Sequence, residues 1–172
     1  NTTKFGTKPL APKEESIYQP GPKNNKANFF LTPLCLSLVL MVLVFAISYK
    51  DYMNNKRNRW LDISMFFVTG IAGVVIFCLW FLTDHTATAN NFNILWAFPL
   101  NLIIAFYVMR NKPLPVWLKS VVLLLLTLLI LTVILWLLKV QIFSPVLIPI
   151  LLALAVRYTF MYFYIRKQNT AT

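Results

Sequence analysis

The sequence predicts an all-α integral membrane protein, built as a bundle of five transmembrane helices. The chain has 172 residues, of which 59% are hydrophobic and only 12% are charged, and its mean hydropathy is +0.69. Globular domains carry about 25% charged residues, so this deficit indicates that lipid surrounds much of the chain. Five apolar runs of about 20 residues have the length that crosses a bilayer as a helix. Leucine dominates these runs and strict alternation is missing, which excludes a β-barrel.

The segment before the first apolar run, residues 1–28, differs in composition from the rest of the chain. It is rich in Pro, Lys and Asn and has no apolar periodicity. Such a composition predicts an extended linker. Because the chain starts at Asn1 and no signal peptide precedes the first apolar run, we expect a further domain upstream. Residues 29–172 then form the five-helix transmembrane domain of a larger protein.

The predicted spans follow one another with short loops and cover residues 29–49, 63–83, 92–109, 114–138 and 143–165. The first is the clearest of the five. The second is bracketed by Asp62 and Asp84, and its middle reads TGIAGVV. Small residues let helix backbones approach closely in lipid. We therefore expect Gly70, Ala72 and Gly73 to form a packing face and not a binding site.

The last three predicted spans each have a distinguishing feature. The third is short, and Pro99 and Asn101 interrupt it, whereas the fourth contains the leucine-rich run VVLLLLTLLILTVILWLL. The fifth has Pro145 and Pro149 near its start and Arg157 within it. Arg157 lies about two helical turns before the basic C-terminal tail, so we expect its side chain to snorkel to the membrane interface. For Asn101, a polar contact within the bundle and a functional role both stay open.

The distribution of Lys and Arg predicts the orientation of the bundle. The first loop, the third loop and the C-terminal tail are basic, whereas the second loop has no Lys or Arg and the fourth has only Lys139. Cytoplasmic loops are enriched in these residues, so we expect the N-terminus outside, in the periplasm, and the C-terminus in the cytoplasm. Five lysines in residues 1–28 oppose this orientation, but long translocated segments cross largely regardless of charge. Topology thus explains the net charge of +11, and no basic-aromatic surface indicates nucleic-acid binding.

The second loop gathers unusual polar chemistry in the stretch WFLTDHTATANNFNILW, residues 80–96. It holds the only histidine of the chain, His85, beside Asp84. A histidine works as an acid or base near neutral pH, and an acidic neighbour polarises it. Asp84 and His85 are therefore candidate residues for assisting catalysis. The same residue types also satisfy helix ends, and Asn90 or Asn91 is suited to cap the third span, so a capping role stays open. The candidates for binding lipid or substrate are Trp80, Thr83, Thr86, Asn90, Asn91, Asn93 and Trp96.

Other kinds of site find little support in the sequence. Cys35 and Cys78 lie in apolar runs, where we expect them to act as small hydrophobic residues without a disulfide. Cys78 and His85 are separated by about 10 Å along a helix axis, which is too far for a nucleophile and its base. One histidine and two separated cysteines make a zinc site very unfavourable. We expect no metal and no other cofactor.

Residues 60–102 carry a resemblance to a known family. The matching features are LD opening the second span, GIAG in its middle, WF-T-DH at its exit, and N-N-x-N-x-L-W-x-x-P entering the third span. With these features the chain resembles the C-terminal five-span membrane domain of the Lnb family of bacterial lipoprotein N-acyltransferases. The other spans match mainly in number, order and hydrophobicity.

The resemblance implies a multi-pass protein of the bacterial inner membrane that carries a periplasmic, thiol-dependent catalytic domain upstream of its linker. The implied reaction moves an acyl chain from a phospholipid onto the amino group of a lipoprotein's N-terminal diacylglyceryl cysteine. The implied partners are membrane phospholipid, the diacylglyceryl lipoprotein and the upstream domain of the same chain.

Two functions remain open. In the first, the bundle is the membrane half of an acyltransferase, and residues 80–96 contact lipid or substrate. In the second, the bundle is a passive anchor or assembly subunit, and the same residues only cap helices or dock a partner. A transporter is the weakest alternative, because there is no evident inverted repeat and ionisable residues are sparse. A lipid-wide cavity beside the polar loop distinguishes the first function from the second.

Overall fold

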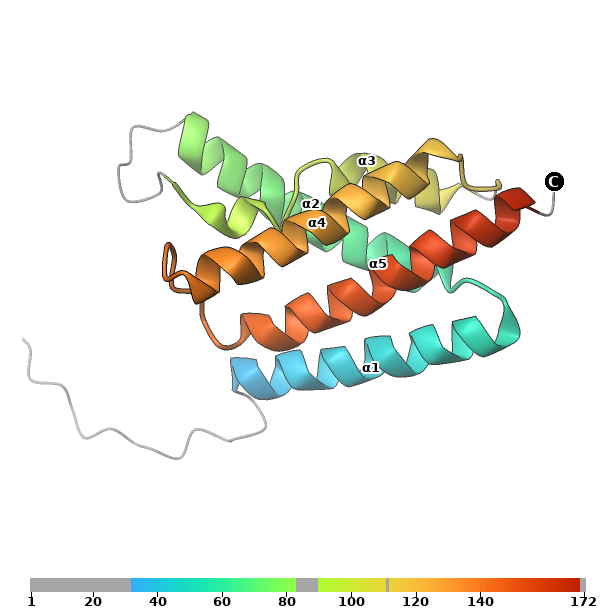
Figure 1. Cartoon of the computed structure of the whole chain (residues 1–172), viewed down its shortest axis with the longest axis horizontal. Helices are drawn as coiled ribbons and strands as arrows, with labels where there is room; N and C mark the ends of the chain where they lie inside the picture. The colour runs from blue at the N-terminus through green and yellow to red at the C-terminus, as the bar shows by residue number, and fades with distance from the viewer. Residues whose placement is uncertain (1–31, 83–89, 111, 171–172) are drawn as a thin grey trace, which may run out of the picture.

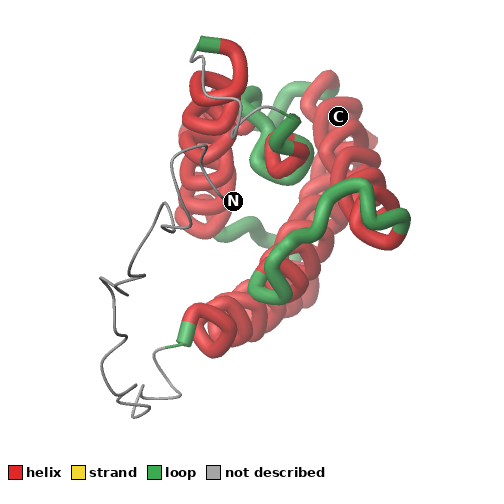
Figure 2. The backbone as a smooth tube through the Cα atoms, turned by 90° about the vertical axis from the view of Figure 1, so that its left-hand side faces the viewer, coloured by secondary structure: helices red, strands yellow, loops and turns green. Residues whose placement is uncertain are grey.

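The computed structural model describes residues 32–82, 90–110 and 112–170. Over these residues it contains helices and connecting loops only (Figure 2), which confirms the all-α prediction there. In chain order the elements are α1 (Pro33–Asn54), α2 (Arg59–Phe81), η3 (Phe92–Ile94), α3 (Asn101–Met109), α4 (Trp117–Leu137) and α5 (Leu147–Thr170) (Figure 1).

Four of the helices, α1, α2, α4 and α5, are long and apolar enough to cross a membrane. They correspond to the first, second, fourth and fifth predicted spans, with ends that differ by a few residues. Capping side chains set two of these ends, which hydropathy does not detect. Thr32 Oγ1 accepts a hydrogen bond from the Cys35 N–H at the start of α1, at 3.3 Å. Asn58 Oδ1 accepts one from the Leu61 N–H at the start of α2, at 3.1 Å.

The third predicted span, residues 92–109, differs from the expectation of one continuous helix. It forms the short η3, an irregular segment, and then α3 of nine residues. A helix of this length covers about 14 Å, less than half of the hydrocarbon core. Pro99 has no backbone N–H and occupies the turn just before α3, where no helical bond is lost. The described chain therefore has four helices of membrane-crossing length and a fifth, shorter helix.

The long helices alternate in direction (Figure 1). We call the end of the bundle where α1 begins the N-terminal end, and the end where α5 finishes the C-terminal end. The N-terminal end contains the start of α1 and α5, the end of α2 and α4, and η3. The C-terminal end contains the opposite termini of these helices and the end of α3. Helix α5 packs against both α1 and α4, while α2 packs against α3. Loops one and three thus lie at one end with the C-terminal tail, as the loop charges predict.

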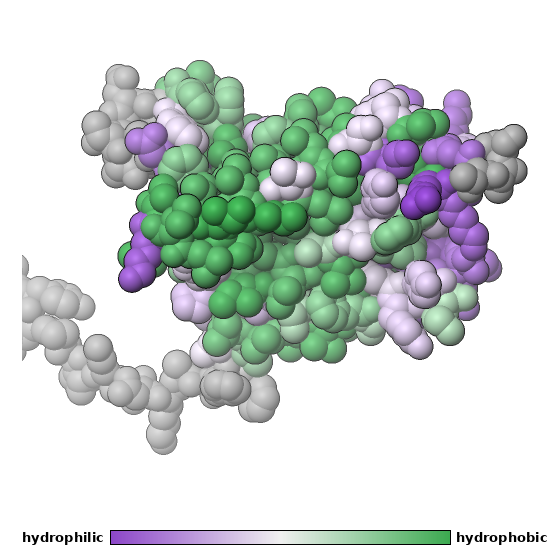
Figure 3. All heavy atoms as spheres, viewed as in Figure 1, coloured by the Kyte–Doolittle hydropathy of each residue, from purple (hydrophilic) through white to green (hydrophobic). Residues whose placement is uncertain are grey.

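On the face shown in Figure 3 the bundle is apolar across its middle, and most of the hydrophilic residues gather at the C-terminal end. In α1, Leu40, Val42 and Leu43 are more than half exposed. A soluble protein rarely exposes a continuous apolar surface of this extent, because hydration of such a surface is unfavourable. The apolar helices and their exposed side chains together indicate a multi-pass membrane protein.

The glycines of α2 lie where another segment approaches its backbone. A Cβ atom on Gly70 would lie 2.5 Å from the backbone nitrogen of Leu102 in α3. A Cβ atom on Gly73 would overlap the carbonyl oxygen of Ala97 and lie 2.7 Å from the nitrogen of Pro99. The predicted packing face is therefore confirmed at both glycines.

Candidate functional site

The polar loop after α2 is described only at its two flanks. The predicted candidates Thr83, Asp84, His85 and Thr86 lie outside the described residues. Trp80 is half-buried near the end of α2, and Asn90 is exposed just before η3. The backbone of Asn90 has a φ of 58°, in the left-handed region that asparagine tolerates better than most residues. Asn90 thus turns the chain into η3.

The asparagines after this turn form a chain of side-chain hydrogen bonds. Asn91 Oδ1 accepts from the backbone N–H of Asn93 at 3.2 Å and from its Nδ2 at 2.8 Å. Asn93 Oδ1 in turn accepts from Trp96 Nε1 at 2.8 Å. Asn91 is the N-cap of η3, so the capping role that the sequence left open is present for this residue at η3, whereas Leu100 precedes α3 without a side-chain cap. The N-N-x-N-x-L-W motif holds Asn93 and Trp96 in a fixed relation.

Contacts from two other elements position η3. The Phe92 N–H donates a hydrogen bond to Gln141 Oε1 at 2.8 Å, which ties η3 to the connection between α4 and α5. The Phe92 ring meets Trp80 of α2 edge to face, with ring centroids 6.1 Å apart. The sequence did not reveal Gln141 as a partner, because 49 residues separate it from Phe92. The end of α2, η3 and the α4–α5 connection thus form one packed unit.

A cavity of about 450 Å³ opens beside this unit at the N-terminal end of the bundle. Asn93 and Trp96 line it on one side and Pro33, the first residue of α1, on another. The remaining wall comes from the α4–α5 connection and the first turns of α5, namely Ile142, Phe143, Ser144, Val146, Leu147 and Ile150. A mostly apolar cavity of this size with a few fixed polar groups is typical of a small-molecule or lipid site. Of the described candidates, the structure brings Asn93 and Trp96 to it; Trp80, Asn90 and Asn91 are not among its lining residues.

The middle of α5 contains a buried charge. Arg157 has no exposed surface, so the expectation that it snorkels to the interface is wrong. Its Nε donates to Asp62 Oδ1 at 2.5 Å, and its Nη1 donates to Asp51 Oδ2 at 2.8 Å. The guanidinium also donates to the hydroxyl of Ser48 and the carbonyl oxygen of Asn58. The carboxylates lie about 100 residues away in sequence, which explains why the local pattern around Arg157 did not reveal them.

These contacts belong to a charge network, which we define as Asp51, Arg57, Asp62 and Arg157. Arg57 Nη1 pairs with Asp62 Oδ2 at 3.2 Å, so two carboxylates balance two guanidinium groups. Asp51 Oδ2 also accepts the Asn58 N–H at 2.8 Å. Buried ions need this degree of pairing, because an uncompensated charge in a low-dielectric interior is very unfavourable. The network joins α1, the first loop, α2 and α5, and its carboxylates are bound as structural acceptors.

A second buried polar contact joins α2, α3 and α5. Asn101 Nδ2 donates to Thr69 Oγ1 at 2.9 Å and to the Tyr158 hydroxyl at 3.4 Å. Tyr158 also stacks on Phe66 of α2, with ring centroids 5.4 Å apart. The polar contact that the sequence left open for Asn101 is thus present, and it fixes the start of α3.

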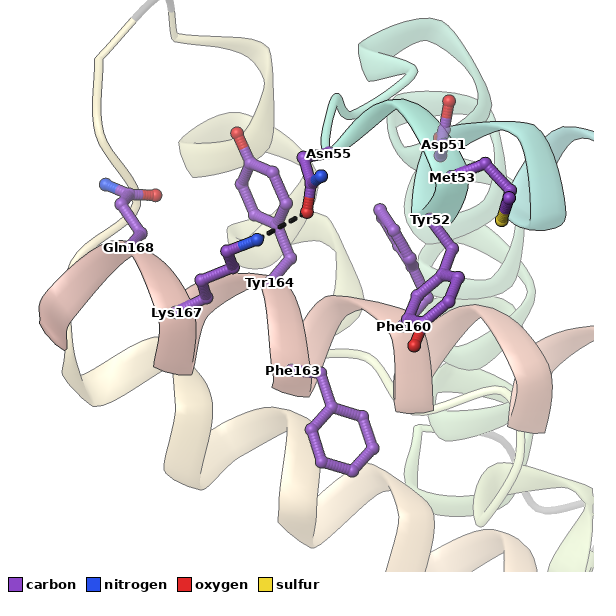
Figure 4. Close-up of a pocket in the computed structure, with 9 residues that line it drawn as sticks. All are labelled: Asp51, Tyr52, Met53, Asn55, Phe160, Phe163, Tyr164, Lys167 and Gln168. Atoms are coloured by element: carbon purple, nitrogen blue, oxygen red, sulfur yellow. Dashed lines mark hydrogen bonds between the residues drawn. The ribbon is translucent and has the colours of Figure 1, made fainter. Parts of the chain in front are cut away.

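Two further cavities lie at the C-terminal end of the bundle. One, of about 620 Å³, lies between the end of α1 and the end of α5 (Figure 4). Asp51 and Phe160 line it, and Lys167 Nζ donates to Asn55 Oδ1 at its edge, at 2.5 Å. The other is smaller and basic, and it lies beside Arg110. Neither contains a residue that the sequence singled out for catalysis or lipid binding.

Metal ligands and thiols give no alternative site within the described ranges. There, His, Cys, Asp and Glu side chains do not gather in groups of three or more. Cys35 and Cys78 are both free, which agrees with their expected role as small hydrophobic residues.

Comparison with known families gives a match over most of the chain. The model of the family described as the Lnb transmembrane domain matches residues 24–169, which is most of the chain. No curated protein matches the chain, and no solved structure does. The match extends over α1 to α5, well beyond residues 60–102 that carried the resemblance.

Proposed function

The chain belongs to the family of Lnb transmembrane domains, and from this premise we propose that it is the membrane domain of a bacterial lipoprotein N-acyltransferase. In this proposal the bundle lies in the inner membrane and anchors a periplasmic, thiol-dependent catalytic domain through residues 1–28. It presents phospholipid or lipoprotein to that domain at the outer leaflet. The upstream domain supplies the nucleophile, so the bundle assists the reaction and does not complete it alone.

The observation that carries this proposal is the cavity at the N-terminal end of the bundle. Its apolar wall suits an acyl chain, and Asn93 adds a polar group that its own hydrogen bonds hold in place. Pro33 places the start of α1 at the same cavity. A domain joined to α1 through residues 1–28 is therefore tethered at the same end of the bundle as this cavity. A passive anchor has no need of a shaped cavity at this point.

Asp84 and His85 precede η3 by fewer than ten residues, so we propose that they act near this cavity. Acyl transfer to an amino group requires a base to remove a proton from the attacking nitrogen and groups that polarise the acyl carbonyl. A histidine with an acidic neighbour is suited to the first task. The aspartate and histidine thus take the assisting role, and the lipid and the diacylglyceryl lipoprotein are the partners.

Orientation is the first requirement of this proposal. Single cysteines introduced at Thr88 and at Lys56, in a chain whose own two cysteines are replaced by serine, are expected to label differently in intact spheroplasts. A membrane-impermeant thiol reagent should modify position 88 and leave position 56 unmodified, because basic loops stay in the cytoplasm. Modification of position 56 alone would reverse the orientation and place the cavity in the wrong leaflet.

The catalytic contribution is tested with Asp84→Asn and His85→Asn in the full-length protein. We expect lipoprotein N-acylation to fall at least about tenfold, the low end for lost acid–base assistance, with thermal stability unchanged. A capping role needs only a hydrogen-bond acceptor, which asparagine keeps, and then both variants stay within about 1 kcal/mol of the parent stability with full activity. N-acylation of lipoproteins by mass spectrometry and thermal unfolding in detergent are the two measurements.

The cavity itself is tested in the same assay by filling it. Val146→Trp places a large ring in the cavity wall, whereas Leu138→Trp adds the same ring at an exposed position of the same end, outside the cavity. We expect only Val146→Trp to lower N-acylation. If this variant and both asparagine variants keep full N-acylation, the bundle is a passive anchor.

A further inference from the structure

A basic pocket lies at the C-terminal end of the bundle, opposite the proposed substrate cavity. It has a volume of about 380 Å³. Four of its lining residues are cationic, no carboxylate lines it, and Tyr164 and Gln168 of α5 complete the polar part. The cationic residues come from the first and third loops, namely Arg57, Arg59, Arg110 and Lys112.

Backbone carbonyls, aromatic rings and, for Arg57, the Asp62 carboxylate of the charge network hold the arginines of the basic pocket in place. Arg57 and Arg59 donate to the carbonyl oxygens of Val108 and Met109, the last two residues of α3, at 3.4 and 3.1 Å. The guanidinium of Arg110 lies over the rings of Phe106 and Tyr107, 4.4 and 5.1 Å from their centroids. Aromatic contact of this kind orients a guanidinium without neutralising it. The pocket is thus pre-organised for an anion.

The position of the basic pocket specifies the kind of anion. It lies where α2 and α4 begin, at the end of helices that cross the membrane, which is the depth of phospholipid headgroups. Phe106, Met109 and Trp117 expose apolar surface along α3 and at the start of α4. Basic pockets at this depth bind the phosphate of anionic lipids, to which each cation contributes.

We propose that the basic pocket binds the phosphate headgroup of an anionic phospholipid, whose acyl chains lie along the exposed apolar side chains of α3 and α4. Arg110 and Lys112 contact the phosphate, and Arg59 adds a third cation, whereas Arg57 lines the pocket with its charge balanced by Asp62. This inference does not rest on the proposed function, since the pocket lies at the other end of the bundle and does not require acyl transfer.

The test is a lipid titration of the purified full-length protein in detergent, followed by native mass spectrometry. We expect phosphatidylglycerol to bind at least about tenfold more tightly than phosphatidylcholine. The double variant Arg110→Gln/Lys112→Gln should lose about tenfold in affinity for phosphatidylglycerol and little for phosphatidylcholine. The matched control, Lys50→Gln/Lys56→Gln, removes the same charge from exposed positions of the same end outside the pocket, and it should change affinity by less than about twofold.

Three outcomes would overturn this site: equal affinity for the two lipids, equal losses in the two double variants, or displacement of phosphatidylglycerol by inorganic phosphate at equal concentration. The last would show a site for soluble anions, since inorganic phosphate lacks the acyl chains. If loss of the aromatic contacts of Arg110 unfolds the double variant, the titration is repeated with Lys112→Gln alone. Lys112 is exposed, so this substitution leaves the fold intact. A loss of about threefold or more supports the site, and a smaller loss contradicts it.

Discussion

Replacing Arg157 by methionine is expected to lower the free energy of unfolding by about 3–5 kcal/mol, the range for breaking a buried ion pair. The guanidinium bonds to two carboxylates and two further oxygens in a fully buried position. Its removal leaves Asp51 and Asp62 with Arg57 as the only cation of the network. Unfolding in detergent, followed by circular dichroism against denaturant or temperature, measures the loss.

A second substitution separates lost charge balance from lost packing. Arg157→Met/Asp51→Asn removes one charge of each sign and leaves the Arg57–Asp62 pair intact. We expect this double variant to be more stable than the sum of the two single losses by about 1–3 kcal/mol, because contacting charges couple. Strict additivity, or a stable Arg157→Met variant, would contradict the network as a source of stability.

Gly73→Leu is expected to destabilise the bundle by about 2–3 kcal/mol, at the upper end for overpacking. The added side chain meets backbone atoms of Ala97, Phe98 and Pro99, which have no rotamer through which to move away. The same segment follows Trp96, so the variant should also disturb the cavity that Trp96 lines and, under the proposed function, lower N-acylation. Thermal unfolding and the acylation assay of the full-length protein report the two effects.

Val75→Leu is the matched control for this change. It also enlarges an α2 side chain, but at a position that is about half exposed to the surroundings of the bundle. Such surface substitutions usually change stability by less than about 0.5 kcal/mol. Equal stability of Gly73→Leu and Val75→Leu would mean that the segment before α3 does not pack on α2 as described.

The fold was predictable where a local pattern is sufficient. Apolar length identified four membrane-crossing helices, and small residues identified the packing face at Gly70 and Gly73. The third span was harder, because hydropathy counts apolar residues without detecting that the segment around Pro99 packs on those glycines as an irregular chain. Loop charges predicted which connections share an end, and the alternation of the helices follows from the short loops.

The candidate site was predictable in part for the same reason. Asn93 and Trp96 stand in one motif, so the sequence placed them together, and the structure places them at one cavity. The opposite wall comes from the start of α5, and no local pattern connects it with η3. Arg157 shows most clearly what a local sequence pattern does not detect. Its position suggested an interface, whereas Asp51 and Asp62, at the ends of distant helices, determine its burial.

The charge network also has a consequence for biogenesis. Membrane proteins are synthesised from the N-terminus, so Asp51 and Asp62 enter the nascent protein about 100 residues before Arg157. During that interval Arg57 alone balances them, and α1 has no α5 to pack against. The last helix thus brings the missing charge and the missing packing surface together. Any product truncated before Arg157 therefore keeps a carboxylate of the network without its guanidinium partner.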